Sequence, residues 1–140
     1  MLEKEAILGY WSIAGNAQAM RYLLAYVGAR WKDKLYIERS EWFEKDKKQL
    51  HLTFPNLPYL LDGNMNITET SALLRYIPKR WGYPELLGRT VEEQLKVDMY
   101  LGVLQDIWSA ASPLMFSQNW KEEKETTLHK IQAGLSNLIR

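Results

Sequence analysis

The stretch 54–63 constrains the fold of this chain more than any other. Residues 57–61 are short and apolar, and the Asp62-Gly63 pair that follows tolerates positive φ, so the pattern predicts a buried strand that opens a hairpin. Pro58 removes a ladder donor, which restricts it to a strand start, an edge or a cis peptide bond. If that bond is cis, the N–H and C=O of Leu57 turn outward and offer an edge on which a short peptide adds as a strand.

The residues after the hairpin predict a helix with a polar start. Thr68 or Thr70 is expected to N-cap a helix through residues 71–76, whose free N–H groups and positive dipole end favour a carboxylate. Glu69 is placed to accept from an ammonium group. A peptide edge beside an anion-binding helix start predicts a site for a small zwitterionic peptide.

Composition narrows the classes of function. The 140 residues suggest one domain or two small lobes, and 46% hydrophobic with 25% charged residues is typical of a soluble globular protein. Because the net charge is only +1 and the charges are interleaved, we expect neither nucleic acid nor a membrane surface as a partner. No apolar run approaches the ~20 residues that span a bilayer, and the first residues lack the apolar core of a signal peptide.

The chain has no cysteine, which excludes disulfides, thiolate metal sites and chemistry on a protein thiol. Any thiol chemistry must therefore use a thiol that the ligand brings. The two histidines, His51 and His129, lack the spacing of metal ligands, so we expect both at the surface and no bound metal.

The predicted order of elements in the first half is β-α-β-α-β-β-α. Residues 6–10 form the first strand, and a helix that Gly28 ends follows. A strand over 31–37 and a short, charged, solvent-facing helix over 41–50 precede the hairpin. Pro78 is expected to end or kink the last helix just before it. A strand–helix–strand unit of this length implies a parallel pair, to which the hairpin adds antiparallel strands. This order predicts an α/β thioredoxin-like fold.

Three motifs resemble those of the cytosolic glutathione transferases, and their sequences are most similar to the mu class. They are Leu8-Gly9-Tyr10-Trp11, residues 54–60 and residues 72–77, and the similarity runs from about Ala6 to the end of the chain. The resemblance implies a thioredoxin-like glutathione-binding domain followed by an all-α domain. The predicted domain bounds are 1–82 for the glutathione-binding domain, 83–89 for a linker and 90–140 for a truncated helical domain.

The helical part is predicted to consist of two long helices. Thr90 with Glu93 fits a capping box for a helix over 91–116 that Pro113 bends, and a narrower helix follows over 120–139. The chain stops roughly halfway through the helical domain that the family usually has. It is therefore either a truncated form or a chain for which two helices suffice, and the single apolar stripe of the last helix favours the second interpretation.

The hydroxyl of Tyr10 is the candidate catalytic group. A lone tyrosine at a strand end is ordinarily a boundary residue, so the role rests on the match to the Gly9-Tyr10-Trp11 motif. A phenol donates to a thiolate and not to a thiol, which lowers the thiol pKa from about 8.5 without a protein base. The resemblance also implies that Trp11 donates its indole N–H to glutathione, beside a role in core packing.

The resemblance implies further contacts to glutathione. Trp42 and a following lysine would hold its glycine carboxylate. Counting back from Asn56 gives Lys47, whereas counting forward from Trp42 gives Asp46, and Lys45 is the other candidate. The spacing before Trp42 is sigma-like, so mu and sigma-like classes both stay open. The remaining predicted glutathione-binding residues are Asn56, Leu57, Pro58, Glu69, Thr70 and, from the partner subunit, Asp106.

The resemblance also implies an electrophile site and a dimer. Phe116 stands where the mu class has a tyrosine whose hydroxyl assists some substrates, so that assistance should be missing. Phe54 would insert into the partner subunit, and Arg75 would lie at the two-fold axis. The predicted electrophile-binding residues are Ile13, Trp108, Ser112 and Phe116, and the predicted dimer residues are Phe54, Arg75 and Asp98.

We therefore expect a cytoplasmic, homodimeric glutathione transferase of detoxification. It would use glutathione as co-substrate and conjugate it to small hydrophobic electrophiles. The alternative is a non-catalytic protein on the same fold that binds glutathione or hydrophobic ligands or serves as a scaffold. The short helical lobe and the departures from the family pattern at Glu69-Thr70 and Phe116 favour it. A fragment unable to close its core is a third possibility.

Overall fold

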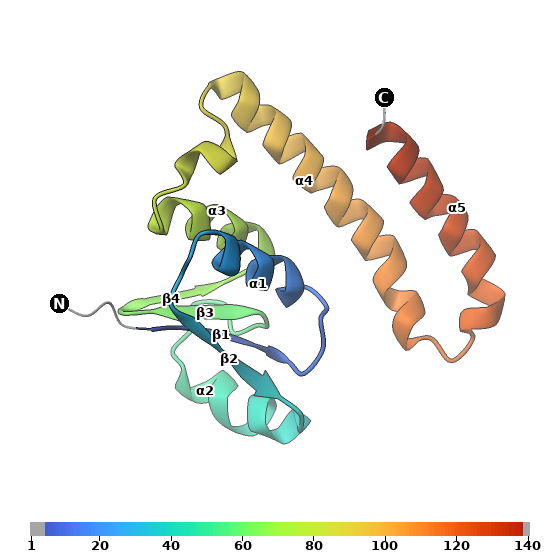
Figure 1. Cartoon of the computed structure of the whole chain (residues 1–140). Helices are drawn as coiled ribbons and strands as arrows, with labels where there is room; N and C mark the ends of the chain where they lie inside the picture. Colours follow the sequence, from blue (N-terminus) through green and yellow to red (C-terminus); the bar gives the residue numbers. More distant parts are fainter. Residues whose placement is uncertain (1–4, 139–140) are drawn as a thin grey trace. The chain divides into compact units, whose positions relative to one another are not determined.

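The computed structural model describes residues 5–138 and divides the chain into two compact units. The first unit ends at Leu87 and the second begins at Gly88. Figure 1 shows a sheet with helices in the first unit and two long helices in the second.

The sheet of the first unit has four strands in the order β2-β1-β3-β4. Strand β1 (Ala6–Trp11) runs parallel to β2 (Trp31–Tyr36) and antiparallel to β3 (Tyr59–Asp62), which pairs with β4 (Met65–Thr68) in the predicted hairpin. This is the mixed sheet of a thioredoxin-like fold, as the sequence predicted. The paired part of β3 begins two residues later than expected, after Pro58.

Helices lie on both faces of this sheet (Figure 1). Helices α1 (Ala17–Tyr26) and α3 (Thr70–Arg80) lie together on one face. The segment of η1 (Glu41–Asp46) and α2 (Lys47–Gln49) lies on the other face, and η2 (Pro84–Leu87) is a single 3₁₀ turn after α3. The apolar faces of α1 and α3 meet the sheet in a core whose fully covered side chains include Leu8, Met20, Leu24, Leu60, Leu73 and Ile77.

Two expectations about α3 are not met. Of the predicted end or kink at Pro78, the end does not occur, because the helix continues to Arg80. Pro78 costs only one helical bond so near the C-terminus, its ring is buried, and its carbonyl accepts from the N–H of Tyr83 at 2.8 Å. Neither Thr68 nor Thr70 is the N-cap, because β4 continues through Thr68 and leaves Glu69 as the single turning residue, without a side-chain cap.

The second unit consists of α4 (Val91–Ala111), η3 (Ser112–Phe116) and α5 (Trp120–Leu138). The capping box is confirmed, since Oγ1 of Thr90 accepts from the N–H of Glu93 at 3.1 Å and a carboxylate oxygen of Glu93 accepts from the N–H of Thr90 at 3.3 Å. The prediction of one bent helix over 91–116 is wrong. The α-helix ends at Ala111 and tightens into a 3₁₀ turn, which suits Pro113 because its ring nitrogen has no hydrogen to donate.

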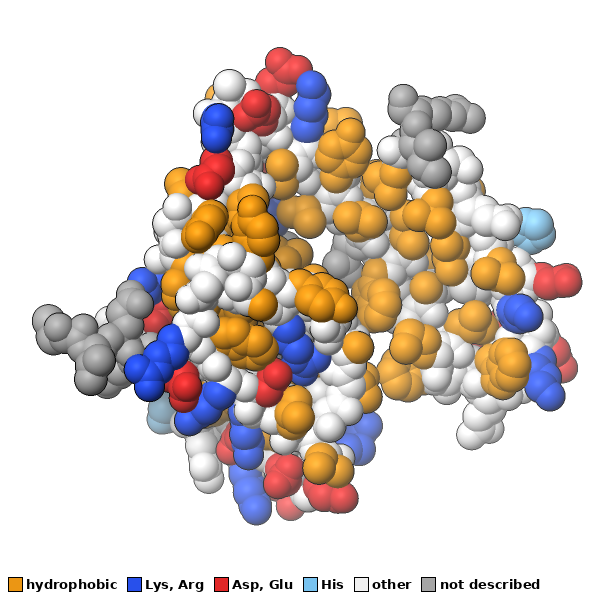
Figure 2. Space-filling model, in the orientation of Figure 1, with side chains coloured by type: hydrophobic (Ala, Val, Ile, Leu, Met, Phe, Trp, Pro, Cys, Tyr) orange, Lys and Arg blue, Asp and Glu red, His pale blue; other side chains and the backbone are white. Residues whose placement is uncertain are grey.

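Much apolar surface of the second unit is exposed. None of the residues of α4 is buried, and Figure 2 shows hydrophobic side chains gathered on the surface of the two long helices. Within the described residues, no helix is both long and apolar enough to cross a bilayer. The last residue of the predicted stripe on α5, Ile139, lies outside the described residues. The large exposed hydrophobic residues of α4 are Val91, Leu95, Met99, Tyr100 and Leu104.

Candidate functional site

Tyr10 lies near the end of β1, and its hydroxyl meets a backbone N–H of the following loop. Its side chain is buried, and its Oη accepts from the backbone N–H of Asn16 at 3.2 Å. This loop approaches closely because residue 15 is glycine: a Cβ there would lie 2.8 Å from Oη of Tyr10. Because the oxygen already accepts a hydrogen bond, its own hydrogen remains for a further partner and is polarised toward it.

Arg21 of α1 holds the loop that supplies this N–H. Its Nε lies 3.1 Å from both carboxylate oxygens of Asp33 on β2. Its Nη1 donates to the carbonyls of Ile13 at 3.0 Å and Ala14 at 3.4 Å. A planar guanidinium therefore joins a strand, a helix and the loop beside Tyr10, an arrangement that a lysine cannot reproduce. Sequence reasoning missed Arg21, because its carboxylate partner Asp33 is twelve residues away on strand β2.

Leu57 provides an edge of backbone beside Tyr10. The Leu57–Pro58 peptide bond is cis, and Leu57 lies outside the ladders on both sides of β3. The register pairs Gly9 with Tyr59, and its extension by two residues brings Leu57 level with Trp11. The predicted peptide-binding edge and the predicted catalytic hydroxyl thus come from adjacent ends of neighbouring strands.

The segment that carries Trp42 contains a π turn. The N–H of Lys47 donates to the carbonyl of Trp42, five residues earlier, instead of the four of an α-helix. A π turn contains one more residue than an α turn, so Trp42 and Lys47 lie one turn apart. The one extra residue seen in the sequence after Trp42 is therefore absorbed in the turn, and Lys47, rather than Lys45, follows Trp42 by one turn of helix.

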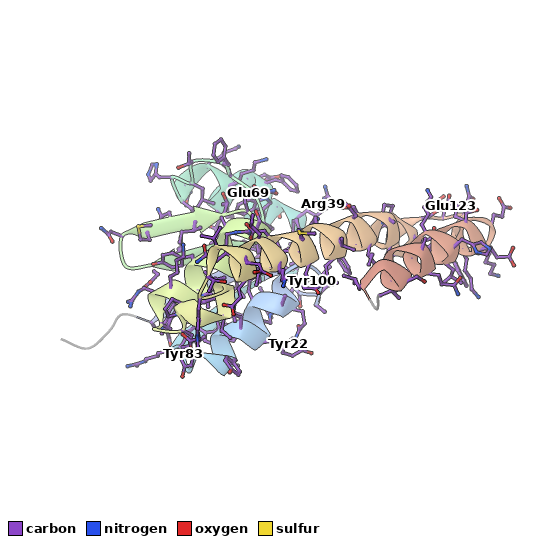
Figure 3. All side chains as sticks on the ribbon, turned by 90° about the horizontal axis from the view of Figure 1, so that it is seen from above. Tyr22, Arg39, Glu69, Tyr83, Tyr100 and Glu123 are labelled. Atoms are coloured by element: carbon purple, nitrogen blue, oxygen red, sulfur yellow. The ribbon has the colours of Figure 1, made fainter. Side chains whose placement is uncertain are left out.

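Two cations and two aromatic rings gather near this turn. The guanidinium of Arg39, labelled in Figure 3, lies 5.0 Å from the ring centre of Phe43, and Nζ of Lys47 lies 5.4 Å from it. Phe43 in turn contacts Trp11 at a ring separation of 6.1 Å. Positive charge is thereby held next to the end of β1. Arg39 lies three residues before Trp42 and was not among the residues predicted from the sequence.

The indole N–H of Trp42 belongs to a residue with only 2% of its surface accessible. It donates to no group in the described part of the chain, and no fully buried side-chain polar atom there lacks a partner. The ring stacks on Tyr59 with centres 5.9 Å apart and meets the edge of Tyr36 at 5.5 Å. Trp42 therefore presents a donor from a fixed position. The expectation that the 41–50 segment faces solvent is wrong for this residue.

Glu69 has an unusual backbone conformation for a non-glycine residue, with φ of +71°. Its side chain is exposed, and Figure 3 labels it on the first unit. Thr70 is the first residue of α3, so the free N–H groups of that helix start directly after Glu69. Strained residues of this kind cluster at ligand sites, which supports a functional role for Glu69.

The other predicted residues are distributed over both units. In the first unit, Ile13 and Phe54 are exposed, with 46% and 68% of their surfaces accessible, and Nη1 of Arg75 donates to the carbonyl of Ser71 at 2.9 Å. In the second unit, Asp98 and Asp106 are exposed on α4, Trp108 and Ser112 are half-buried, and Phe116 is exposed. Their roles in binding electrophiles and in dimerisation stay predictions.

The first unit matches a family model described as Glutathione S-transferase, N-terminal domain, over residues 6–79. The chain belongs to the glutathione S-transferase (GST) family. In sequence, this GST-family chain is 36% identical to mouse glutathione S-transferase Mu 5, over 96% of the chain and 62% of the relative. It is 35% identical to human glutathione S-transferase Mu 3, over 95% of the chain and 60% of the relative. The chain thus spans about three fifths of the length of these curated relatives.

Solved structures agree on the fold of this GST-family chain. A nematode-specific GST of C. elegans matches with a TM-score of 0.80 at 19% identity, over 96% of this chain and 66% of the other. A Nu-class GST from Haemonchus contortus matches with a TM-score of 0.62 at 23% identity, over 78% of this chain and 50% of the other.

Proposed function

We propose that this GST-family chain binds glutathione and transfers its sulfur to small hydrophobic electrophiles. The observation that carries the proposal is the hydroxyl of Tyr10, which accepts from the N–H of Asn16 beside the unpaired edge at Leu57. A thiol held at that edge meets a phenol whose hydrogen is free to donate. The chain has no cysteine, so the reacting sulfur belongs to the ligand.

Each end of glutathione meets groups of matching charge. The backbone of Leu57 binds the cysteinyl part, flanked by Asn56 and Pro58. Glu69 binds the γ-glutamyl ammonium, and the start of α3 at Thr70 binds the adjacent carboxylate, for which free helix N–H groups are suited.

The glycine carboxylate of glutathione binds at the opposite end of the site, near the π turn. The indole N–H of Trp42 and the ammonium of Lys47 bind it, and the positions of these two residues one π turn apart support Lys47 over Lys45. Trp11 donates its indole N–H to the same ligand, and Arg39 adds a second positive charge near Phe43.

Tyr10 acts by hydrogen bonding. It donates to the sulfur once the thiol proton has left to solvent, and this favours the thiolate over the thiol. With a chloronitrobenzene, the thiolate forms a carbon–sulfur bond at the ring carbon that carries chlorine, and chloride leaves with the electron pair of its bond. The donor stabilises the anion without taking or giving a proton.

The electrophile and the partner subunit complete the proposal. Ile13, Trp108, Ser112 and Phe116 bind the apolar electrophile. The active form is a cytoplasmic homodimer in which Asp106 of the partner subunit faces the γ-glutamyl ammonium. The dimer residues are Phe54, Arg75 and Asp98, and the 68% exposure of Phe54 leaves its ring available for insertion into a partner.

Two measurements test the proposal together. Calorimetric titration should detect glutathione binding to the wild-type chain and to Tyr10→Phe. Conjugation to a chloronitrobenzene should fall by roughly 10²-fold in Tyr10→Phe, the usual effect of removing one anion-stabilising donor. Tyr22→Phe is the matched control, because Tyr22 is an exposed tyrosine on α1. Unchanged turnover in Tyr10→Phe would remove Tyr10 from this role, and binding without turnover in the wild type would favour the non-catalytic alternative.

A further inference from the structure

A short chain of hydroxyl groups ends on the carboxylate of Asp46. Oη of Tyr36 donates to Oδ2 of Asp46 at 2.6 Å, and Oη of Tyr59 lies 2.8 Å from Oη of Tyr36. Because the single hydroxyl hydrogen of Tyr36 goes to the carboxylate, Tyr59 is the donor in the second bond. Burial, followed by the bond to Asp46, raises the pKa of Tyr36, so this phenol remains a donor.

The two tyrosines of this chain also hold the ring of Trp42. Tyr36 ends β2 and Tyr59 begins β3, and the indole packs against both rings. Gly9 makes room for this arrangement, since a Cβ at position 9 would lie 2.1 Å from the ring of Tyr59. The hydroxyl of Tyr36 donates to Asp46 and is itself bonded by Tyr59, while both rings pack against Trp42, so the two ends of the turn are linked through this tyrosine pair.

Asp46 is the last residue of the π turn, between Trp42 and Lys47. It is the residue that the sequence count from Trp42 reaches where a lysine was expected. Its side chain points inward to Tyr36, and the next residue, Lys47, has its ammonium over Phe43. The bond from Tyr36 to Asp46 thus adds a side-chain anchor at the end of the turn, between the packed indole of Trp42 and the backbone of Lys47.

We propose that Asp46 is a positioning residue that fixes the π turn and thereby directs Trp42 and Lys47 to the glycine carboxylate of glutathione. This inference rests on the proposed function, since it concerns the same ligand. Asp46 itself does not touch the ligand, whose carboxylate it would repel. Its contribution therefore depends on whether the ligand has a glycine carboxylate.

A ligand without glycine therefore distinguishes a positioning role of Asp46 from a general role in folding. γ-Glutamylcysteine has the thiol and the γ-glutamyl group of glutathione but lacks glycine. Loss of the anchor should weaken glutathione binding and leave γ-glutamylcysteine binding unchanged. A general loss of fold would weaken both ligands alike.

The test is calorimetric titration of the full chain with glutathione and with γ-glutamylcysteine. Asp46→Ala and Tyr36→Phe should each raise the Kd of glutathione about tenfold, the scale for losing a hydrogen bond to a charged group. Asp46→Asn, which keeps one acceptor oxygen, should recover part of the affinity. Glu44→Gln is the matched control, because it removes a charge from the same turn at an exposed residue that makes no hydrogen bond or ion pair within the described residues.

Lys47→Ala provides the benchmark for the glycine end. It should also raise the Kd of glutathione and spare γ-glutamylcysteine, and combining it with Asp46→Ala should add little, because both remove the same contact. If Asp46→Ala weakens the binding of both ligands equally, or of neither, the positioning role is overturned. The proposed function would still hold in that case, provided that the wild-type chain binds glutathione. Failure of the wild-type chain to bind either ligand would overturn the proposed function and this inference with it.

Discussion

The two units of the chain bury their apolar residues differently. In the first unit, side chains from all four strands and from α1 and α3 close a shared core, and the buried hydrophobic residues of the described chain all lie between Ala6 and Pro78. In the second unit, helix α4 buries no residue. The positions of Tyr10 and Trp42 are thus determined by contacts inside the first unit. The apolar surface of α4 is of the kind that marks association, which supports the proposed homodimer.

The largest expected effect compares one glycine in each unit. Gly9→Ala places a Cβ 2.1 Å from the ring of Tyr59, so we expect it to lower the free energy of unfolding by about 3 kcal/mol. Gly102→Ala, in α4, meets no atom within 4 Å and should raise it by about 0.5–1 kcal/mol through better helix propensity. Chemical denaturation measures both. Equal effects of the two substitutions would contradict the difference in packing between the units.

Loss of an ion pair should likewise destabilise the first unit more than the second. Arg21→Ala removes the paired bonds to Asp33 and the bonds to the loop after Tyr10, with an expected loss of about 2 kcal/mol. Lys96→Ala removes an exposed pair with Glu92 at 2.7 Å and should change stability by less than about 0.5 kcal/mol. Thermal unfolding of both variants checks the ranking, and a larger loss in Lys96→Ala would reverse it.

The starts of α3 and α4 provide a third comparison. Glu69→Gly relieves a positive φ at a position without a side-chain cap, so we expect about 1 kcal/mol more stability together with weaker glutathione binding. Thr90→Ala removes the cap of α4 and should cost about 1 kcal/mol. Denaturation with parallel titration of glutathione measures both. A Glu69→Gly variant that binds glutathione as tightly as the wild type would exclude Glu69 from the site.

The smallest expected effect is a pH dependence of the capping box. Hydrogen bonds from the backbone N–H groups of Arg89 and Thr90 hold the pKa of Glu93 below its usual range. A carboxylate with a lowered folded-state pKa stabilises the fold above its unfolded-state pKa of about 4.5 and loses this contribution as the pH falls through the folded value. The destabilisation caused by Glu93→Gln should therefore be larger at pH 7 than at pH 3. An equal destabilisation at both pH values would contradict the assignment.

Local patterns were sufficient for much of the fold. The apolar period of α1, the turn at Asp62-Gly63 and the capping box at Thr90 each involve residues close in sequence, so their chemistry is visible without tertiary contacts. The candidate site was predictable where it follows from backbone geometry. The edge at Leu57 is of this kind, because a proline within a short apolar strand leaves few arrangements.

The failures arose where distant packing decides local structure. Pro78 stays inside α3 because its ring is buried and its carbonyl finds a partner in Tyr83, neither of which the helix pattern shows. Asp46, at the end of the π turn, meets Tyr36, which is ten residues away on another element, and this contact is not visible in the sequence. The sequence did contain a signal of this turn, the mismatch of one residue between the counts from Trp42 and from Asn56.

The most direct test of the central claim is the pKa of the glutathione thiol bound to the chain. It is measured by the ultraviolet absorbance of the thiolate as the pH is varied, in the wild type and in Tyr10→Phe. We expect the bound thiol of the wild type to ionise well below its reference of about 8.5, and the variant to return it toward that value. The same thiol pKa in both proteins would contradict the assignment of Tyr10 as the donor to the thiolate.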